Sequence, residues 1–438
     1  MLLRSCVESK LLHLLRAYSP SALGPRPHLV DGRLQDLWEV LLGESLDASA
    51  RSQMALPVSR GGLGVGSLSL RHAAAYLGSW SLCFTSVLER LPVADRAYLR
   101  SGFLGQECSL RTVEHVHHAC QQLLALGVSH NKLPQWDFLA KQPLRQAQRF
   151  LVRPVLASRF QQLLVSLDVP GRARLRSCCG VGAGAFLLCC PSDSDGTELL
   201  DGAFLHAVRW RLGLPVCAPG LRCCRCFSKG AVRRCGAFLD CAGDHLVCCN
   251  VGGFKTFLHS RLVAALRGIL RDSVAWVPDR EVMVWPWGQR PGEAARLEIE
   301  YVVAGARRHV DVVVKHPRAK HVVAEAADSF GAAAAQGEKD KLRRYPAKPE
   351  FALHEVVPFT VETFGRLGAS SLRLLKEARQ RVTESDRRFS GWHGVVLHQR
   401  WQARLSCALV AGLWDGAAAS WGYFGARAGL WDEVLDLG

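Results

Sequence analysis

Apolar positions recur at helical spacing along the first third of the chain. The segments LQDLWEVLLGESL and RTVEHVHHACQQLLALGV place leucine and valine three or four residues apart, which is typical of amphipathic helices. Proline and glycine interrupt this pattern in SPSALGPRP and in the turn from Gly61 to Gly66. We therefore expect a helical region over residues 1–150, which continues as a helical linker over residues 151–216.

The pattern changes after residue 216. Residues 217–250 are rich in cysteine and have no helical or strand period. A helical segment follows, GGFKTFLHSRLVAALRGIL, and then come three β-rich runs, VAWVPDREVMVW, ARLEIEYVV and RHVDVVVKHP. An alanine-rich helix is expected over Ala324–Tyr345, and a further strand in ALHEVVPFTVETF.

This order of elements, α-β-β-β-α-β, predicts a mixed α/β domain over residues 251–384. The chain from Ala369 onward has a helical pattern and several tryptophans, so residues 385–438 are expected to form a helical tail. For the whole chain we predict an α+β multidomain protein with a helical N-terminal half.

The composition is that of a folded, basic protein. Of the 438 residues, 49% are hydrophobic and 21% are charged, which argues against a disordered chain. The 55 Lys and Arg residues exceed the 39 Asp and Glu residues, and the net charge of +16 favours DNA, RNA or an anionic membrane as a partner. The alternative is a basic protein with no polyanionic partner.

Charges also interrupt the apolar segments. No apolar run long enough to span a bilayer is free of charge, so we expect no membrane span. The first residues, MLLRSCVESKLLHLLRAY, are typical of an amphipathic helix and not of a signal peptide. An intracellular, reducing location is the expectation that follows.

Seventeen cysteines are present, and eight of them lie between Cys217 and Cys249. In a reducing compartment such a cluster favours a zinc site over disulfides. His245 and Cys249 have the spacing of a short helical turn, and Cys235 lies ten residues before His245. The fourth ligand is expected among three neighbouring thiols: Cys223, Cys224 and Cys226. The alternative is a set of small buried apolar side chains.

Basic residues alternate with these cysteines, which suits a small module that contacts phosphates: Arg222, Arg225, Lys229, Arg233 and Arg234. The pairs Cys178-Cys179 and Cys189-Cys190 have no histidine nearby. They lie among Ala, Gly and Leu, so we expect them to pack in the core.

Two carboxylates flank the turn Ala304-Gly305-Ala306. Glu298 and Asp311 stand thirteen positions apart on two β-rich runs, and antiparallel pairing about the turn would bring them together. Adjacent carboxylates suit a hard cation such as Mg²⁺, which can activate water and stabilise a pentavalent phosphate. The alternative is a pair of strand carboxylates neutralised by Arg307 and Arg308.

Taken together, these segments resemble the C-terminal part of the polyprotein of non-LTR retrotransposons of the restriction-like-endonuclease type. LPVSRGGLGVGSLSLRHAAAYLGSW resembles the thumb of the reverse transcriptase and its extension, and RARLRSCCGVGAGAFLLCCPSDSDGTELLDGAFLHAVRWRLGLP resembles the linker before the zinc knuckle. CGAFLDCAGDHLVCCNVGG resembles the knuckle, which selects Cys235, His245 and Cys249 as ligands. The position after PGLR selects Cys223, with Cys226 close behind.

The nuclease motifs match with substitutions. Leu258-His259-Ser260 stands where the family has Arg-His-Asn, and Leu297-Glu298 stands where it has Pro-Asp, whereas Asp311 is retained. The family's Lys-x-x-Lys/Arg-Tyr motif matches Lys341, Arg344 and Tyr345, and PFTVETFG matches the strand that closes the nuclease core. Lys315, four residues past Asp311, is the alternative to Lys341 as the catalytic lysine.

The resemblance implies a restriction-endonuclease-like domain of the PD-(D/E)XK type that nicks target DNA with Mg²⁺, with Glu298, Asp311 and Lys341 as catalytic residues. It also implies structural Zn²⁺, DNA and element RNA as partners, and a nuclear or cytoplasmic location. His259, Arg344 and Tyr345 would join the basic residues of the knuckle in nucleic-acid binding. No Tyr/Phe-x-Asp-Asp motif occurs, so polymerisation is not expected of this chain alone. The alternatives are a zinc-knuckle remnant that binds nucleic acid without cutting it, and an inert relic.

Overall fold

The computed structural model describes most of the chain. The described residues are 9–224, 226–229, 231–251, 254–273, 277–278, 281–284, 287, 294–303, 305–347, 353–385 and 391–421, with only the backbone described for 9, 226–229, 231–234, 419 and 421. By their internal contacts the residues divide into two compact units. Unit 1 comprises Met1–Pro57 and Gly64–Ser166, and unit 2 comprises Val58–Leu63 and Leu167–Gly438.

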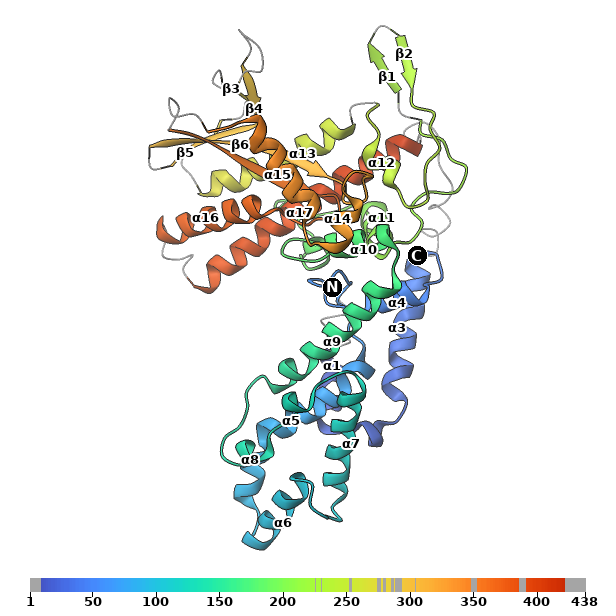
Figure 1. Ribbon diagram of the computed structural model, residues 1–438, viewed down its shortest axis with the longest axis vertical. Helices are drawn as coiled ribbons and strands as arrows, with labels where there is room; N and C mark the ends of the chain where they lie inside the picture. The colour runs from blue at the N-terminus through green and yellow to red at the C-terminus, as the bar shows by residue number, and fades with distance from the viewer. Residues whose placement is uncertain are drawn as a thin grey trace. The chain divides into compact units, whose positions relative to one another are not determined.

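The described part of unit 1 is helical, as the apolar spacing predicts (Figure 1). Its elements are α1 (Ser9–Ala17), α2 (Pro20–Leu23), α3 (Arg26–Leu42), α4 (Ala48–Met54), α5 (Leu68–Arg90), α6 (Val93–Phe103), α7 (Arg111–Ala125), the 3-10 turn η2 (His130–Lys132), α8 (Trp136–Leu139) and α9 (Ala147–Ser166).

Helix α5 is the core element of unit 1. It begins at Ser67, whose hydroxyl accepts a hydrogen bond from the Leu70 amide at 3.2 Å, a typical N-cap. Its buried face carries Phe84, which stacks on Phe103 of α6 with ring centroids 4.7 Å apart and meets Trp136 of α8 edge-on at 5.3 Å. This aromatic cluster holds α5, α6 and α8 together.

Unit 2 is built around a three-stranded sheet in the order β5-β6-β7. Strand β5 (Ile299–Val303) pairs antiparallel with β6 (Ala306–Lys315), and β6 pairs parallel with β7 (His354–Glu362). The parallel pair is joined through α14 (Val323–Asp328) and α15 (Ala332–Arg344). Two further pairs of short strands are β1 (Cys226–Lys229) with β2 (Ala231–Arg234), and β3 (Val282–Val284) with β4 (Ala295–Leu297).

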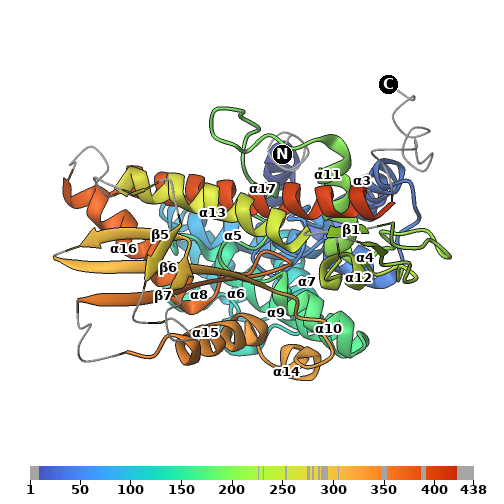
Figure 2. The same ribbon diagram turned by 90° about the horizontal axis from the view of Figure 1, so that it is seen from above.

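Helices cover both faces of this sheet, as Figure 2 shows. On one face lie α13 (Phe254–Ser273) and α16 (Ala369–Ser385), backed by α17 (Trp392–Trp421), whereas α15 lies on the other. Because strand side chains alternate between faces, Val310 and Val312 of β6 pack in the core with α13, and Asp311 faces α15. The sheet thus presents one buried carboxylate to a helix that carries lysine.

The remaining elements of unit 2 precede the sheet in sequence: α10 (Val169–Ser177), the 3-10 turn η3 (Ala185–Leu187), α11 (Asp201–Leu212) and α12 (Asp244–Cys248). The mixed α+β class predicted from the sequence is therefore confirmed. None of the helices in the described ranges is long and apolar enough to cross a membrane.

Two expectations differ from the structure. The alanine-rich segment forms two helices instead of one, because Gly331 takes the left-handed conformation (φ 76°) just before α15. Of the four cysteines expected in the core, Cys178 and Cys179 are buried, but Cys190 is exposed, so the expectation is wrong for Cys190. Cys189 is half-buried, and its sulfur lies 3.8 Å from that of Cys407 in α17.

Candidate metal centre and carboxylate site

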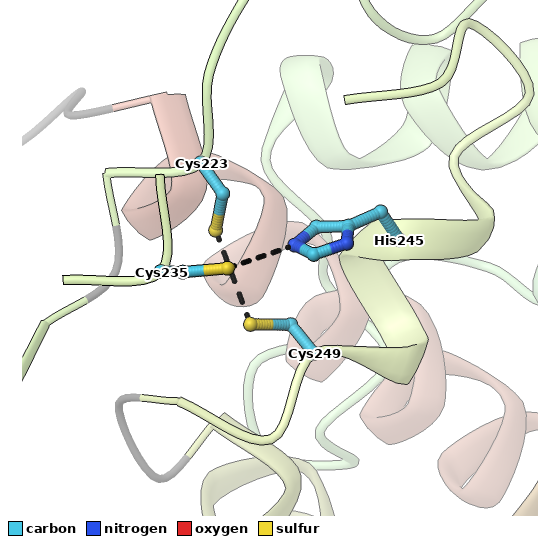
Figure 3. Close-up of side chains that lie close together, drawn as sticks. All are labelled: Cys223, Cys235, His245 and Cys249. Carbon is cyan, nitrogen blue, oxygen red and sulfur yellow. Dashed lines mark hydrogen bonds between the residues drawn. The ribbon is translucent and has the colours of Figure 1, made fainter. Parts of the chain in front are cut away.

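Four side chains from the cysteine-rich segment converge on one point (Figure 3). They are Cys223, Cys235, His245 and Cys249, and their ligand atoms all lie within 4.8 Å of one another. The sulfurs of Cys223 and Cys249 are 4.0 Å apart, and the Cys235 sulfur lies 3.4 Å from Nε2 of His245. We call these four residues the cysteine cluster. Three thiols and one imidazole at these separations could hold a zinc ion in tetrahedral geometry.

Local backbone hydrogen bonds explain how the segment brings these ligands together. The Cys223 amide donates to the Ala237 carbonyl at 2.8 Å, and the Gly236 amide donates back to the Cys223 carbonyl at 3.1 Å, which sets Cys223 beside Cys235. The Asp240 carboxylate accepts the amides of Asp244 (2.8 Å) and His245 (2.7 Å), which fixes the start of α12. The single turn of α12 then places His245 and Cys249 side by side.

The structure separates two of the three candidates for the fourth ligand. Cys223 is buried in the cluster, whereas the neighbouring Cys224 is exposed and directs its thiol to the Arg222 carbonyl at 3.5 Å. The side chain of Cys226 lies outside the described residues. Cys223 thus completes a Cys₃His set.

The basic residues expected to contact phosphates lie on and before the β1–β2 hairpin. Arg222 is exposed, and its guanidinium lies 3.8 Å from the centre of the Phe238 ring and donates to the Gly236 carbonyl at 2.9 Å. Arg225 lies outside the described residues, as do the side chains of Lys229, Arg233 and Arg234. The backbone of these last three residues belongs to the hairpin.

The second cluster surrounds Glu298 and Asp311. The hairpin register pairs Ile299 with Val310, and continuing it by one residue sets Glu298 opposite Asp311. Glu298 stands at the bend between β4 and β5. Its Oε2 accepts the amide of Val312 at 3.1 Å, and its backbone amide donates to the Val310 carbonyl at 3.2 Å. These bonds fix the Glu298 carboxylate against β6, next to Asp311.

Helices on either side supply cations to these carboxylates. Nζ of Lys341, in α15, lies 2.7 Å from Oδ1 of Asp311, and Nε2 of His259, in α13, lies 3.1 Å from Oε1 of Glu298. Lys315, the other candidate lysine, instead contacts the Asp340 carboxylate at 2.7 Å. The lysine brought to Asp311 is therefore Lys341, thirty positions away in sequence.

Tyr345 and Arg344 follow at the end of α15. Tyr345 is buried and meets Trp287 edge-on with ring centroids 6.2 Å apart, so its ring is not available for a contact with nucleic acid. Arg344 is exposed, with its guanidinium 5.3 Å from the centre of the Tyr345 ring. The group formed by Glu298, Asp311, His259, Lys341 and Tyr345 is named the carboxylate site below.

Burial and like charge shift the pKa values in this site. Burial raises the pKa of Asp311, the neighbouring Glu298 raises it further, and Lys341 opposes both effects. The hydrogen bond with Glu298 raises the pKa of His259, which favours its charged form. Burial and the negative charge of Asp311 raise the pKa of Tyr345 to about 12, so its hydroxyl stays protonated.

The arginines of the hairpin do not neutralise these carboxylates. Arg307 contacts Glu300 at 3.4 Å, and Arg308 pairs with Glu377 and with Glu355, the latter at 2.9 Å. Among the described residues, the ion-pair partners of Glu298 and Asp311 are therefore helix residues, whereas Arg307 and Arg308 pair with other carboxylates. Helix packing rather than the strand sequence decides their electrostatic environment.

A groove of about 400 Å³ lies beside the carboxylate site within unit 2 and shares His259 with it. It runs from His259 along the end of β6, with Val247 and Cys248 of α12 in its lining. Further basic residues line it: Lys255, Lys315, His316 and His321. The sequence pattern did not predict this groove, because it depends on how α12, α13 and α15 pack around β6.

Polar contacts of Asp244 connect the cysteine-rich segment to the end of the sheet. His316, just past β6, contacts the Asp244 carboxylate at 3.0 Å and the Thr363 hydroxyl at 2.8 Å, and Arg318 contacts Asp244 at 3.2 Å. Asp244 precedes the ligand His245 in α12. The position of the cluster and the shape of the groove are therefore coupled.

Comparisons with known proteins give no assignment. No family model matches the chain, and no curated protein matches it significantly. The function is therefore inferred from the geometry of the two clusters and from the motifs in the sequence.

Proposed function

We propose that the chain is a DNA-binding protein whose carboxylate site cleaves a phosphodiester with the help of a divalent cation. The observation that carries this proposal is the convergence of Glu298, Asp311, Lys341 and His259 from three different elements and one bend. Two adjacent carboxylates can hold a cation that activates water, and a lysine and a histidine beside them can stabilise negative charge on a phosphate.

The donor set fits a hard divalent cation such as Mg²⁺. Lys341 donates a hydrogen bond to Oδ1 of Asp311. The other oxygen, Oδ2, is buried and has no hydrogen-bond partner of ordinary geometry among the described residues. The Tyr345 hydroxyl lies near this carboxylate. An unsatisfied buried carboxylate oxygen next to a second carboxylate is costly, and a cation held by Asp311 and Glu298 would remove that cost. When bound, the cation would lower the pKa of a water molecule and stabilise charge on the phosphate.

The protein groups then have distinct roles. Lys341 neutralises Asp311 in the structure, and in the nuclease its ammonium would stabilise the negative charge that develops on the phosphate. His259 holds Glu298 in place through its hydrogen bond and adds a second positive charge at the mouth of the groove. Tyr345 is buried beside the site, and its hydroxyl lies near Asp311.

The cysteine cluster has a structural role in this proposal. Zinc bound there would fix α12, which forms one wall of the groove and contacts His316 through Asp244. The net charge of +16 and the basic lining of the groove favour a polyanion. The resemblance to the nuclease part of non-LTR retrotransposon polyproteins supports target-site nicking as the reaction, with a restriction-endonuclease-like core and element RNA as a further partner.

A supercoiled-plasmid assay tests this proposal. The full chain is incubated with plasmid in Mg²⁺, in buffer without an added divalent cation, and in EDTA, with the zinc content of each sample measured. We expect nicked circles only in the sample that contains Mg²⁺. Asp311→Asn should abolish nicking, whereas Asp340→Asn, which removes a carboxylate from the partly exposed pair with Lys315, should leave it unchanged. Nicking that survives Asp311→Asn would contradict the assignment.

A second candidate is a module that binds nucleic acid without cutting it. The observation that favours it is that His259 and Lys341 already compensate both carboxylates. In addition, Leu258 and Leu297 are buried core residues where the family has arginine and proline. In that case the wild-type protein would bind the plasmid without nicking it in Mg²⁺.

A further inference from the structure

Unit 1 carries a two-part cavity beside α8 and α9 that belongs to neither cluster of unit 2. One part, of about 300 Å³, has a mostly apolar lining that includes Leu133, Phe138, Leu144 and Phe150. The other, of about 330 Å³, shares Leu144 and Phe150 with the first. Its remaining lining residues are mostly cationic: Arg145, Arg149 and Arg153, with Gln146 between them. We call this feature the arginine groove.

The three arginines form a cationic row. They recur every four residues, so Arg149 and Arg153 lie about 6 Å apart along α9, a spacing on the scale of one nucleotide. All three are exposed, and no hydrogen bond or ion pair within the described residues involves their side chains. Their positive charge is therefore available to a ligand.

The surrounding sequence does not neutralise this row. Residues 131–166 contain six Lys and Arg residues and a single acidic residue, Asp137. The Asp137 carboxylate is already paired with Arg100 at 2.9 Å. An excess of positive charge that no acid of the same segment balances favours a polyanion.

Two exposed aromatic rings lie in the same groove. Phe138 is 47% exposed and Phe150 is 50% exposed, and both side chains line the apolar part of the groove. The groove is held on rigid elements, because the Leu144 amide donates to the Ser81 carbonyl of α5 at 3.0 Å and the Thr85 hydroxyl donates to the Leu139 carbonyl at 2.7 Å. Solvent-exposed phenylalanines on a fixed scaffold offer stacking surfaces.

We propose that the arginine groove binds single-stranded nucleic acid, with phosphates on Arg145, Arg149 and Arg153 and bases stacked on Phe138 and Phe150. Aromatic stacking beside a cationic track is the usual means by which proteins bind single strands without reading sequence. A membrane surface would need apolar side chains that protrude, whereas these line a concave cavity. An acidic peptide would use the arginines but would not need the aromatic rings.

This site is independent of the proposed nuclease, and the test uses the full chain. Binding of a fluorescein-labelled twenty-nucleotide oligo(dT) is followed by anisotropy over a range of salt concentrations. The variant Arg145→Gln/Arg149→Gln/Arg153→Gln is compared with Arg90→Gln/Arg96→Gln/Arg111→Gln, which removes three exposed arginines of unit 1 outside the groove. Both variants lose the same net charge, and all the substituted side chains are exposed, so circular dichroism should show unchanged folding.

We expect the groove variant to bind at least tenfold more weakly and to lose about two units of slope in log K against log salt, since each phosphate contact on a single strand contributes about 0.7. The control variant should change binding less than threefold. Phe138→Ala/Phe150→Ala should weaken oligo(dT) about tenfold and leave an abasic oligonucleotide of equal length unaffected.

Three results would overturn the proposal. The first is equal binding of oligo(dT) by the two arginine variants. The second is a phenylalanine variant that binds the abasic strand as weakly as it binds oligo(dT), each compared with wild type. The third is a groove variant that loses binding to phosphatidylserine vesicles or polyglutamate but keeps the wild-type affinity for oligo(dT). The first result would assign the effect to overall charge. The second would show that the phenylalanines do not act by stacking on bases, and the third would assign the groove to a different anion.

Discussion

Replacing Lys341 with methionine should make the stability of the protein depend on pH in a defined way. Lys341 lies 2.7 Å from an Asp311 carboxylate whose side chain is only 2% exposed. Removing one partner of such a buried pair costs about 3–5 kcal/mol when the remaining charge must stay ionised. Asp311 can escape this cost by taking up a proton, so the loss depends on pH.

The direction follows from the pKa of Asp311. Its pKa in the folded protein is raised above its ordinary value of 3.8 by burial and by Glu298, and Lys341 opposes that rise. Without Lys341 the folded-state pKa rises further, so the folded variant binds more protons than the unfolded chain. The contribution of protonated Asp311 to the stability of the variant is then fully present below pH 3.8, and it is lost as pH rises towards the folded-state pKa of Asp311.

We therefore expect Lys341→Met to be close to wild type at pH 4 and less stable by about 3 kcal/mol at pH 8. For a domain of this size that difference lowers Tm by about 6–12 °C. Thermal unfolding followed by circular dichroism at a series of pH values measures it. Mg²⁺ is omitted from the buffer, and no chelator is added, so that zinc is retained.

Two control variants sharpen this test. Lys315→Met breaks the partly exposed pair with Asp340 and should cost less than about 1 kcal/mol at every pH. The double variant Asp311→Asn/Lys341→Met leaves no uncompensated charge and should recover most of the stability at pH 8. An equal loss at pH 4 and pH 8 for Lys341→Met, or an equally large loss for Lys315→Met, would refute the reasoning.

Three further outcomes are expected. Purified protein should contain about one zinc per chain by elemental analysis, and Cys235→Ser should release it and increase proteolysis near α12; a metal-free protein with an intact fold would count against the site. Duplex DNA binding, measured by filter retention, should weaken steeply with salt and depend little on sequence, and a binding constant insensitive to salt would be inconsistent with phosphate contacts. The pKa of His259 is raised by its hydrogen bond with Glu298, so this pair stabilises the fold below the ordinary value of 6.5 and the effect fades as pH rises above it; His259→Gln should flatten the dependence of Tm on pH in that range, and an unchanged profile would argue against the pair.

The α+β class could be predicted because periodicity is a local property. Leucine spacing marks the helices of unit 1, and the valine-rich run before Lys315 marks β6. The two helices α14 and α15 were expected as one because alanine favours helix throughout the segment, but an extended backbone at Ser329 and a left-handed one at Gly331 separate them. The glycine was visible in the sequence, but its conformation was not.

The candidate sites were predictable to different degrees for physical reasons. The candidate ligands His245 and Cys249 could be found because they stand four positions apart, at the start and just past the end of the short helix α12. Spacing alone could not separate Cys223 from Cys224, although the resemblance favours Cys223, because adjacent residues differ only in which side of the backbone they face. The pairing of His259 with Glu298 was also out of reach, because it depends on how α13 packs against the sheet.

The most direct measurement of the central proposal follows binding and cutting in one sample. End-labelled duplex DNA is bound by the full chain without Mg²⁺, and one half is run on a native gel. The other half receives Mg²⁺ and is run on a denaturing gel. We predict that wild type and Asp311→Asn shift the DNA equally, since phosphate contacts elsewhere provide binding, and that only wild type produces a cleaved strand. DNA that is fully bound by the wild-type protein, with zinc present, and is not cleaved in Mg²⁺ would contradict the nuclease assignment.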